Sequence, residues 1–119
     1  MVVDDSRQIR RHVGRTLLES GHDCTEAEHG RACLDLLQNE SFDVILLDWN
    51  MPVLDGLETL KALRAESKWS HIKVIMMTTE NKDEKIQLAL ECGADEYIMK
   101  PLTKEVLLEK LDLANGDLF

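Results

Sequence analysis

Short apolar segments alternate along the chain with longer segments whose apolar residues recur every three or four positions, as in amphipathic helices. The short segments predict five strands, at residues 1–3, 23–28, 44–47, 73–77 and 96–99. A helix is predicted after each strand. Such alternation favours a parallel sheet with right-handed crossovers and helices on both faces. We therefore expect one α/β domain that spans residues 1–119.

The predicted helices have clear start or stop signals. The first follows Asp5 or Ser6, either of which can cap it, and ends at Gly21. Its apolar stripe is Ile9, Val13 and Leu17, and its other faces carry Arg7, Arg10, Arg11 and Arg15. The other helices begin at Gly30, Gly56, Asp83 and Thr103, with inward residues Cys33, Leu34 and Leu37; Leu57, Leu60 and Leu63; Ile86, Ala89 and Leu90; and Leu107, Leu108 and Leu111.

Two predicted strands depart from the regular pattern. Only residues 1–3 precede Asp4, and a central strand this short loses ladder pairing and apolar burial. Either the domain is marginally stable or the sequence starts inside a longer natural chain. The segment 23–28 is weakly apolar, so we expect it nearer an edge of the sheet.

Composition narrows the class of protein. The net charge of -9 argues against direct contact with nucleic acid, whose affinity depends on Lys and Arg neutralising phosphates. No apolar segment approaches the roughly 20 residues of a membrane helix, and the acidic start is not typical of a signal peptide. We therefore expect a cytoplasmic protein without membrane insertion. Cys24, Cys33 and Cys92 lack metal-type spacing and are interpreted as small core thiols.

Polar residues follow the predicted strands at the point where each strand ends. They are Asp4, Asp5, Asp48, Thr78 and Lys100. The carboxyl ends of parallel strands meet at one edge, so we expect these side chains to converge. Three crowded carboxylates repel one another unless a cation lies among them, and oxygen-only ligands suit Mg²⁺ or Mn²⁺ rather than zinc. Asp48, with Thr78 and Lys100 beside it, is the candidate nucleophile toward phosphorus.

Each of these residues also has an ordinary structural interpretation. Acids such as Asp4 and Asp5 are favoured at a helix start. Asp48 alone is typical of an Asx turn, and Lys100 before Pro101 is typical of an ordinary turn. Their joint occurrence at the ends of alternating strands favours a shared site over these separate interpretations.

Two motifs carry a resemblance to a known family. DWNMP at residues 48–52, followed by DGLE at residues 55–58, resembles the phosphoacceptor segment of response-regulator receiver domains, closest to the single-domain chemotaxis response regulators. The resemblance covers nearly the whole chain. It implies a flavodoxin-like (βα)5 fold, a doubly wound parallel sheet with strand order 2-1-3-4-5.

The resemblance also assigns roles at the strand ends. It implies that Asp48 accepts a phosphoryl group from the phosphohistidine of a sensor histidine kinase or phosphotransfer protein. Asp5 and Asp48 would hold Mg²⁺ directly, Asp4 would hold it through water, and the backbone carbonyl of Asn50 would complete the protein's share. Lys100 would pair with the carboxylate and then with the phosphoryl oxygens.

The resemblance further implies a switch. Thr78 would move toward the phosphoryl group, and Tyr97, which alone could be an edge-strand core residue, would follow it from exposed to buried. The surface of the fourth helix, fifth strand and fifth helix would then change its affinity for a downstream effector, such as a flagellar switch in chemotaxis. Thr78 is preferred to Thr79 because it keeps the family's spacing from Asp48. Thr79 itself stands where the chemotaxis type has a smaller residue. The bond between Lys100 and Pro101 is hypothesised to be cis.

Two other functions stay open. A small aspartyl-nucleophile phosphatase would use the same acyl phosphate, but such enzymes generally need a second acid shortly after the nucleophile, where Asn50 stands. A receiver fragment of a longer regulator, with a lost output domain, would keep the chemistry and change only the output. We expect a signalling switch rather than a turnover enzyme.

Overall fold

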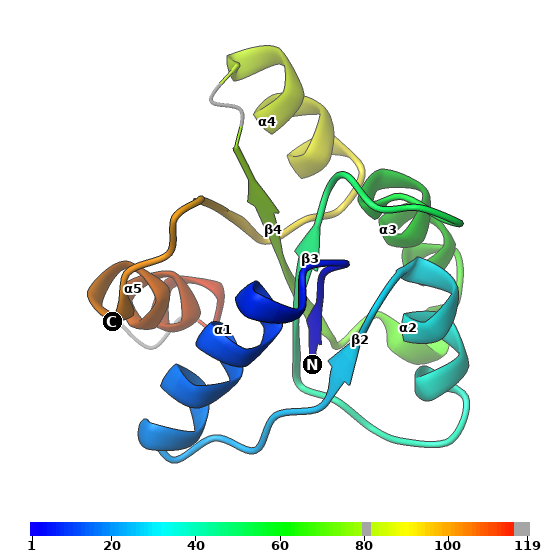
Figure 1. Ribbon diagram of the computed structural model, residues 1–119. Coiled ribbons are helices and arrows are strands. Elements are labelled where there is room, and N and C mark those ends of the chain that lie inside the picture. Colours follow the sequence, from blue (N-terminus) through cyan, green and yellow to red (C-terminus); the bar gives the residue numbers. More distant parts are fainter. Residues whose placement is uncertain (80–81, 116–119) are drawn as a thin grey trace.

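The computed structural model describes residues 1–79 and 82–115. Its elements, in chain order, are β1 (Val2–Val3), α1 (Arg7–Glu19), β2 (Glu26–Ala27), α2 (Gly30–Leu37), β3 (Val44–Asp48), α3 (Gly56–Arg64), the 3-10 helix η1 (Ser67–Trp69), β4 (Lys73–Thr78), α4 (Asp83–Glu91), β5 (Glu96–Met99) and α5 (Lys104–Asn115). All four strand pairs are parallel. The order β2-β1-β3-β4-β5 confirms the predicted flavodoxin-like topology (Figure 1).

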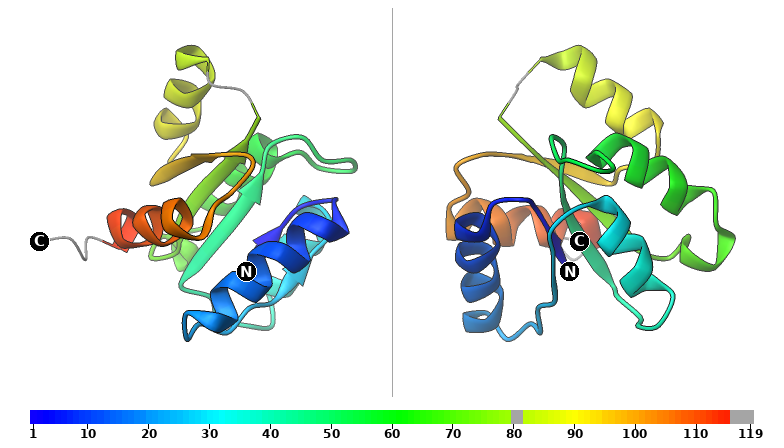
Figure 2. Two further views of the ribbon diagram at one scale, coloured as in Figure 1. Left: turned by 60° about the vertical axis from the view of Figure 1, so that its left-hand side comes forward. Right: turned by 45° about the vertical axis from the view of Figure 1, so that its right-hand side comes forward.

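Helices cover both faces of the sheet. Helices α1 and α5 pack on one face, whereas α2, α3 and α4 contribute to the core on the other. Figure 2 shows the arrangement from two further sides. The alternation of side chains along β3 explains the two cores, because Leu46 faces one helical layer while Ile45 and Leu47 face the other.

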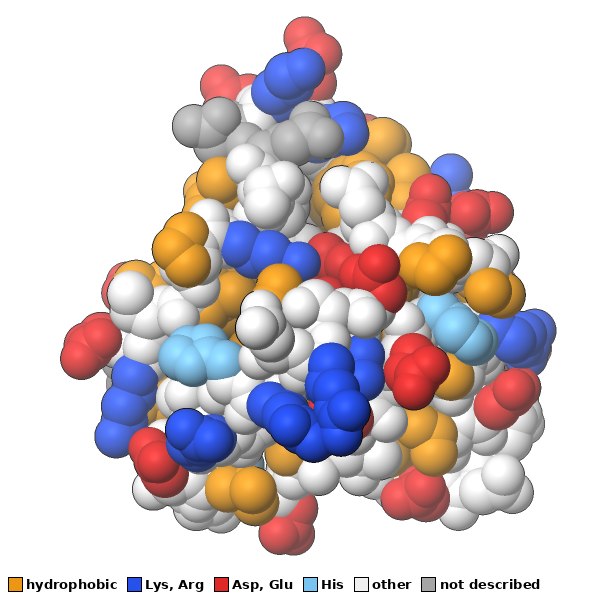
Figure 3. Space-filling view, viewed as in Figure 1, with side chains coloured by type: hydrophobic (Ala, Val, Ile, Leu, Met, Phe, Trp, Pro, Cys, Tyr) orange, Lys and Arg blue, Asp and Glu red, His pale blue; other side chains and the backbone are white. Residues whose placement is uncertain are grey.

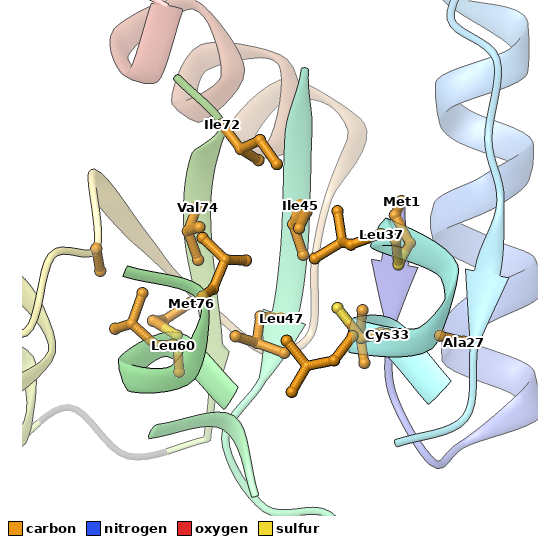
Figure 4. Close-up of a cluster of buried hydrophobic side chains, with 14 of the residues drawn as sticks. Met1, Ala27, Cys33, Leu37, Ile45, Leu47, Leu60, Ile72, Val74 and Met76 are labelled. Carbon is orange, nitrogen blue, oxygen red and sulfur yellow. The ribbon is translucent and has the colours of Figure 1, made fainter. Parts of the chain in front are cut away.

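The larger core lies between the sheet and the layer of α2 and α3. Its labelled members in Figure 4 are Met1, Ala27, Cys33, Leu37, Ile45, Leu47, Leu60, Ile72, Val74 and Met76. Leu60 and Leu63 of α3 are fully buried, as their helical spacing predicted. This packing anchors β3 and therefore fixes the strand end that carries Asp48.

Polar side chains cap the N-termini of α1, α2 and α3. Ser6 caps α1, because its Oγ accepts a hydrogen bond from the backbone N–H of Ile9. A capping box joins Asp55 and Glu58 at the start of α3. His29 caps α2 through Nδ1, a cap that sequence analysis did not anticipate.

The predicted strand 23–28 is reduced to the two residues of β2 and lies at the edge of the sheet, where it was expected. Within the described ranges, no helix is long and apolar enough to cross a membrane. Residues 116–119 of the predicted domain lie outside the described residues.

Several side chains differ from their predicted positions. Arg10 was assigned to a solvent-facing side of the first helix but is buried, because its guanidinium reaches inward to backbone and carboxylate acceptors. Leu90 was predicted to face inward yet is 40% exposed, while its neighbour Ala89 fills the core position of α4. The cysteines, in contrast, are as predicted: Cys33 is buried in one core, Cys24 and Cys92 are half-buried against the cores, and all three thiols are free.

Candidate functional site

Three carboxylates gather at the carboxyl end of the sheet. Asp4 and Asp5 follow β1, and Asp48 is the last residue of β3. One ligand oxygen from each lies within 4.8 Å of the others. Asp4 and Asp48 are buried, whereas Asp5 is exposed. The predicted convergence of these acids is therefore present.

Lys100 joins two of these carboxylates. Its Nζ lies 2.8 Å from Asp4 Oδ2 and 2.9 Å from Asp48 Oδ1. The residue directly follows β5, and its peptide bond to Pro101 is cis, as hypothesised. A charge-assisted pair of this length is among the stronger hydrogen bonds in proteins. The ammonium thus balances part of the negative charge at the site.

Further contacts hold Asp4 in a fixed orientation. The backbone N–H of Ser6 donates to its Oδ1 over 2.8 Å. Arg10 donates to its backbone carbonyl over 2.7 Å and also to Glu26 of β2 over 3.1 Å. With Lys100 on Oδ2, both carboxylate oxygens of Asp4 accept hydrogen bonds within the protein. The contribution of Arg10 is not evident from the sequence, because helical spacing groups it with the exposed arginines.

The buried position of Asp48 changes its protonation equilibrium. Burial raises the pKa of the Asp48 carboxyl above its ordinary value, the hydrogen bond from Lys100 opposes that rise, and the charge of Asp4 adds to it. For Lys100, burial alone would lower the pKa, but the hydrogen bonds to Asp4 and Asp48 outweigh burial and raise it. The site therefore combines a destabilised carboxylate with a firmly protonated lysine.

In the metal-free protein at neutral pH, Asp48→Asn is expected to increase the free energy of unfolding. The raised pKa of Asp48 means that the folded state binds the proton more tightly than the unfolded chain does. Ionised Asp48 therefore costs stability above the raised pKa, and the cost vanishes as the pH falls through that pKa toward the ordinary value. Urea unfolding in EDTA at about pH 7 and about pH 4 should show a gain at the higher pH only.

Asp35→Asn is the matched control for this measurement. Asp35 pairs with Arg31 on an exposed helix surface, so the free energy should change by no more than about 0.5 kcal/mol at either pH. A variant at Asp48 that is less stable than the parent at neutral pH would contradict the prediction.

The remaining predicted site residues differ in how deeply they are buried. Thr78 ends β4 and is buried, and its carbonyl accepts the backbone N–H of Lys100 over 2.8 Å. Thr79 is exposed. Tyr97 is half-buried within β5, and Asn50 is exposed in the loop after β3. Thr78 therefore lies beside Lys100, whereas Tyr97 lies in the neighbouring strand β5.

One aromatic contact near the site had no signal in the sequence. The Nζ of Lys85 in α4 lies 5.5 Å from the ring centroid of Trp49, the residue after Asp48. Trp49 is buried against the same core as α3. The contact connects α4 to the segment that carries Asp48.

The mouth of the site is bordered by apolar and basic surface. An open, largely apolar groove of about 500 Å³ lies beside Lys100, between Ile9 and His12 of α1 and Leu102 of the following loop. Basic side chains gather over α1 on the face shown in Figure 3. Arg7, Arg11 and Arg15 of α1 are all exposed. The surface of α1 is thus positively charged, although the chain as a whole has a net negative charge.

The donor set fits a hard divalent cation. All three converging side chains offer carboxylate oxygens, and Asp5 is exposed to solvent. Mg²⁺ is commonly held by one or two carboxylates, with water and substrate oxygens completing its coordination. Asp5 and Asp48 are the residues that would hold it, because Asp4 already engages both carboxylate oxygens.

Comparison with known proteins agrees with the fold. The family described as response regulator receiver domain matches residues 1–112. The chemotaxis protein CheY homolog of Campylobacter jejuni is 47% identical over 114 residues, which are 94% of this chain and 88% of that protein. The chemotaxis protein CheY1 of Helicobacter pylori is 42% identical over 118 residues, 98% of this chain and 95% of that protein.

Solved structures give the same assignment. The chemotaxis response regulator CheY4 of Vibrio cholerae matches with a TM-score of 0.90 at 40% sequence identity, over 95% of this chain and 94% of that chain. The receiver domain of the Francisella response regulator 1452 matches with a TM-score of 0.86 at 32% identity, over 98% and 95%. The chain belongs to the family of response-regulator receiver domains.

Proposed function

We propose that Asp48 is the phosphoacceptor of a two-component phosphorelay. The observation that carries this proposal is the buried Asp48 carboxylate, paired with Lys100 and crowded by Asp4 and Asp5 at the carboxyl end of the sheet. The phosphodonor is the phosphohistidine of a sensor histidine kinase or phosphotransfer protein. The protein acts in the cytoplasm, without direct contact with nucleic acid.

In the transfer step, a carboxylate oxygen of Asp48 forms a bond to phosphorus while the bond between phosphorus and the donor imidazole breaks. The imidazole leaves with the bonding electron pair and takes a proton from solvent. Lys100 lies within hydrogen-bonding distance of Asp48 and stabilises the charge of the transferred group. The hydroxyl of Thr78 accommodates one phosphoryl oxygen.

Mg²⁺, when bound, neutralises negative charge on the phosphoryl oxygens. Asp5 and Asp48 would hold it directly, Asp4 would act through water, and Asn50 would contribute its backbone carbonyl. The engagement of both Asp4 oxygens by Ser6 and Lys100 supports the indirect role of Asp4. Mn²⁺ has the same preference for oxygen ligands and can substitute.

The output is a changed surface formed by α4, β5 and α5. Thr78 and Tyr97 lie on the neighbouring strands β4 and β5, where Tyr97 pairs with Met76, two residues before Thr78. Phosphorylation adds charge and hydrogen-bond acceptors that bias two arrangements of this surface. The effector is a downstream protein. The relatives are named as chemotaxis proteins, and the effector proposed for this chain is a flagellar switch.

The parent protein is expected to gain one phosphoryl group when incubated with Mg²⁺ and acetyl phosphate. Ionised Asp48 is the nucleophile, so borohydride reduction of the acyl phosphate should convert this residue to homoserine. Intact-mass and peptide mass spectrometry measure both results, and excess EDTA serves as the control. No mass gain with Mg²⁺, or a gain at another residue only, would refute the proposal.

A turnover phosphatase is the alternative chemistry. Asn50 occupies the position where such an enzyme generally carries its second acid, and an amide cannot exchange the required proton. Sustained phosphate release from small phosphomonoesters would favour this alternative. A receiver fragment of a longer regulator would be recognised from the length of the full gene.

A further inference from the structure

Tyr97 contacts two charged residues that also form an ion pair with each other. Lys110 of α5 places its Nζ 4.6 Å from the centroid of the Tyr97 ring. The same Nζ lies 3.1 Å from Glu96 Oε1. That oxygen also accepts the backbone N–H of Tyr97 over 3.1 Å. Glu96, Tyr97 and Lys110 therefore form a closed set of contacts, which we call the tyrosine clamp.

The contacts of the tyrosine clamp depend on one another. Glu96 is tied to the backbone of the residue whose ring Lys110 covers, so the ammonium cannot leave the ring without lengthening its pair with Glu96. Both charged side chains are only about one-fifth exposed, at 21% for Glu96 and 20% for Lys110. Partial burial reduces screening by solvent and salt. A cation over an aromatic face is favoured more strongly when it is partly desolvated.

We propose that Glu96 and Lys110 are positioning residues that hold the Tyr97 ring in its half-buried position in the unphosphorylated protein. This inference rests on the proposed function in assigning Tyr97 to the switch. The tyrosine clamp sets how readily the ring leaves this position, and therefore how far phosphorylation shifts the surface of α4, β5 and α5. Removing the charge of Glu96 leaves the Lys110 ammonium without the partner that fixes it over the ring, and removing Lys110 takes away the cation itself. Either change therefore frees the ring.

The composition of the chain allows a direct measurement of the ring. Tyr97 is the only tyrosine in the 119 residues, so labelling with 3-fluorotyrosine places one fluorine probe at this site. Beryllofluoride, a mimic of the aspartyl phosphoryl group, gives a reference for the switched state. The clamp variants are Glu96→Gln and Lys110→Met. Their matched controls are Glu109→Gln and Lys104→Met, which alter exposed charges on α5.

Without phosphorylation, the fluorine signal of both clamp variants is expected to move away from the parent position, with about a fivefold change in the ratio of the two ring positions. The control variants should keep the parent signal. The double variant Glu96→Gln with Lys110→Met should match Lys110→Met alone, because both changes remove one coupled set of contacts. Raising the ionic strength from about 0.1 M to about 1 M should move the parent signal in the same direction but by less than either clamp substitution, because the partly buried pair is only weakly screened.

Clamp variants whose fluorine signals coincide with those of the controls would overturn the inference. Phosphoryl uptake from acetyl phosphate, measured on the same samples, separates this result from failure of the proposed function. Clamp variants should take up the phosphoryl group as the parent does, since neither residue contacts Asp48. If the parent takes up no phosphoryl group, the proposed function fails, and the signals of the unmodified variants still decide whether the clamp holds the ring.

Discussion

Replacing Lys100 with methionine is expected to slow phosphorylation of Asp48 at least about a hundredfold, the usual cost of removing one donor that stabilises charge in a transition state. Methionine has a similar length and fills the same space, but it offers no positive charge and no N–H donor. The ammonium now lies within 2.9 Å of both Asp4 and Asp48. The rate of mass gain with acetyl phosphate and Mg²⁺ measures the effect.

Loss of this lysine should also lower stability in the metal-free protein. Asp4 is fully buried, and a buried ion pair that loses one partner typically costs about 3 kcal/mol or more. The cost should decrease at acidic pH, where Asp48, whose carboxyl has a raised pKa, becomes neutral. Lys104→Met is the matched control, because Lys104 is exposed at the start of α5. A Lys100→Met protein that is phosphorylated at the parent rate would exclude the assigned role.

Gly56→Ala is expected to destabilise the protein by about 3 kcal/mol and to weaken Mg²⁺ binding. A Cβ at Gly56 would overlap the backbone carbonyl of Asp48 and lie 2.8 Å from the Cα of Trp49. These neighbours are backbone atoms, so the strain cannot be relieved by a side-chain rotation. Gly56 N–H also donates to the carbonyl of Trp49 over 2.8 Å, which holds the start of α3 against the end of β3.

Gly14→Ala provides the contrasting control for Gly56→Ala. Its Cβ would meet only the Sγ of Cys24, at an ordinary 3.6 Å, in the middle of α1. Alanine is the better helix former, so this variant should gain about 0.5 to 1 kcal/mol. Urea unfolding measures both variants, and calorimetric titration measures Mg²⁺ binding. A Gly56→Ala protein as stable as the parent would contradict the close approach described here.

The hydrophobic pattern was sufficient to predict the strands of the sheet and most of the helix side chains that pack against it. The apolar spacing of Leu60 and Leu63 identified the buried face of α3, and both side chains are fully buried. Leu90 was misassigned because apolar spacing cannot show which of two adjacent residues the sheet will cover. The two-residue length of β2 was also missed, since pairing with only one neighbouring strand limits its ladder.

The strand-end acids and Lys100 were predictable because parallel strands bring their carboxyl ends to one edge. The contacts that support these residues could not be predicted from the sequence. Arg10 reaches the carbonyl of Asp4 from α1, and Lys110 reaches Glu96 from α5. Both contacts depend on how a helix is rotated against the sheet, which sequence spacing alone leaves open.

The short strand β2 has a consequence for how copies of the domain behave beside one another. A sheet edge is a template on which a second chain can pair and begin an amyloid-like stack. At this edge β2 contributes only the two residues Glu26 and Ala27. Glu26 adds a negative charge to this edge, and Arg10 ties it to the helix behind. This edge therefore offers few backbone groups on which a second copy could pair, even when many copies are concentrated in a small volume of the cell.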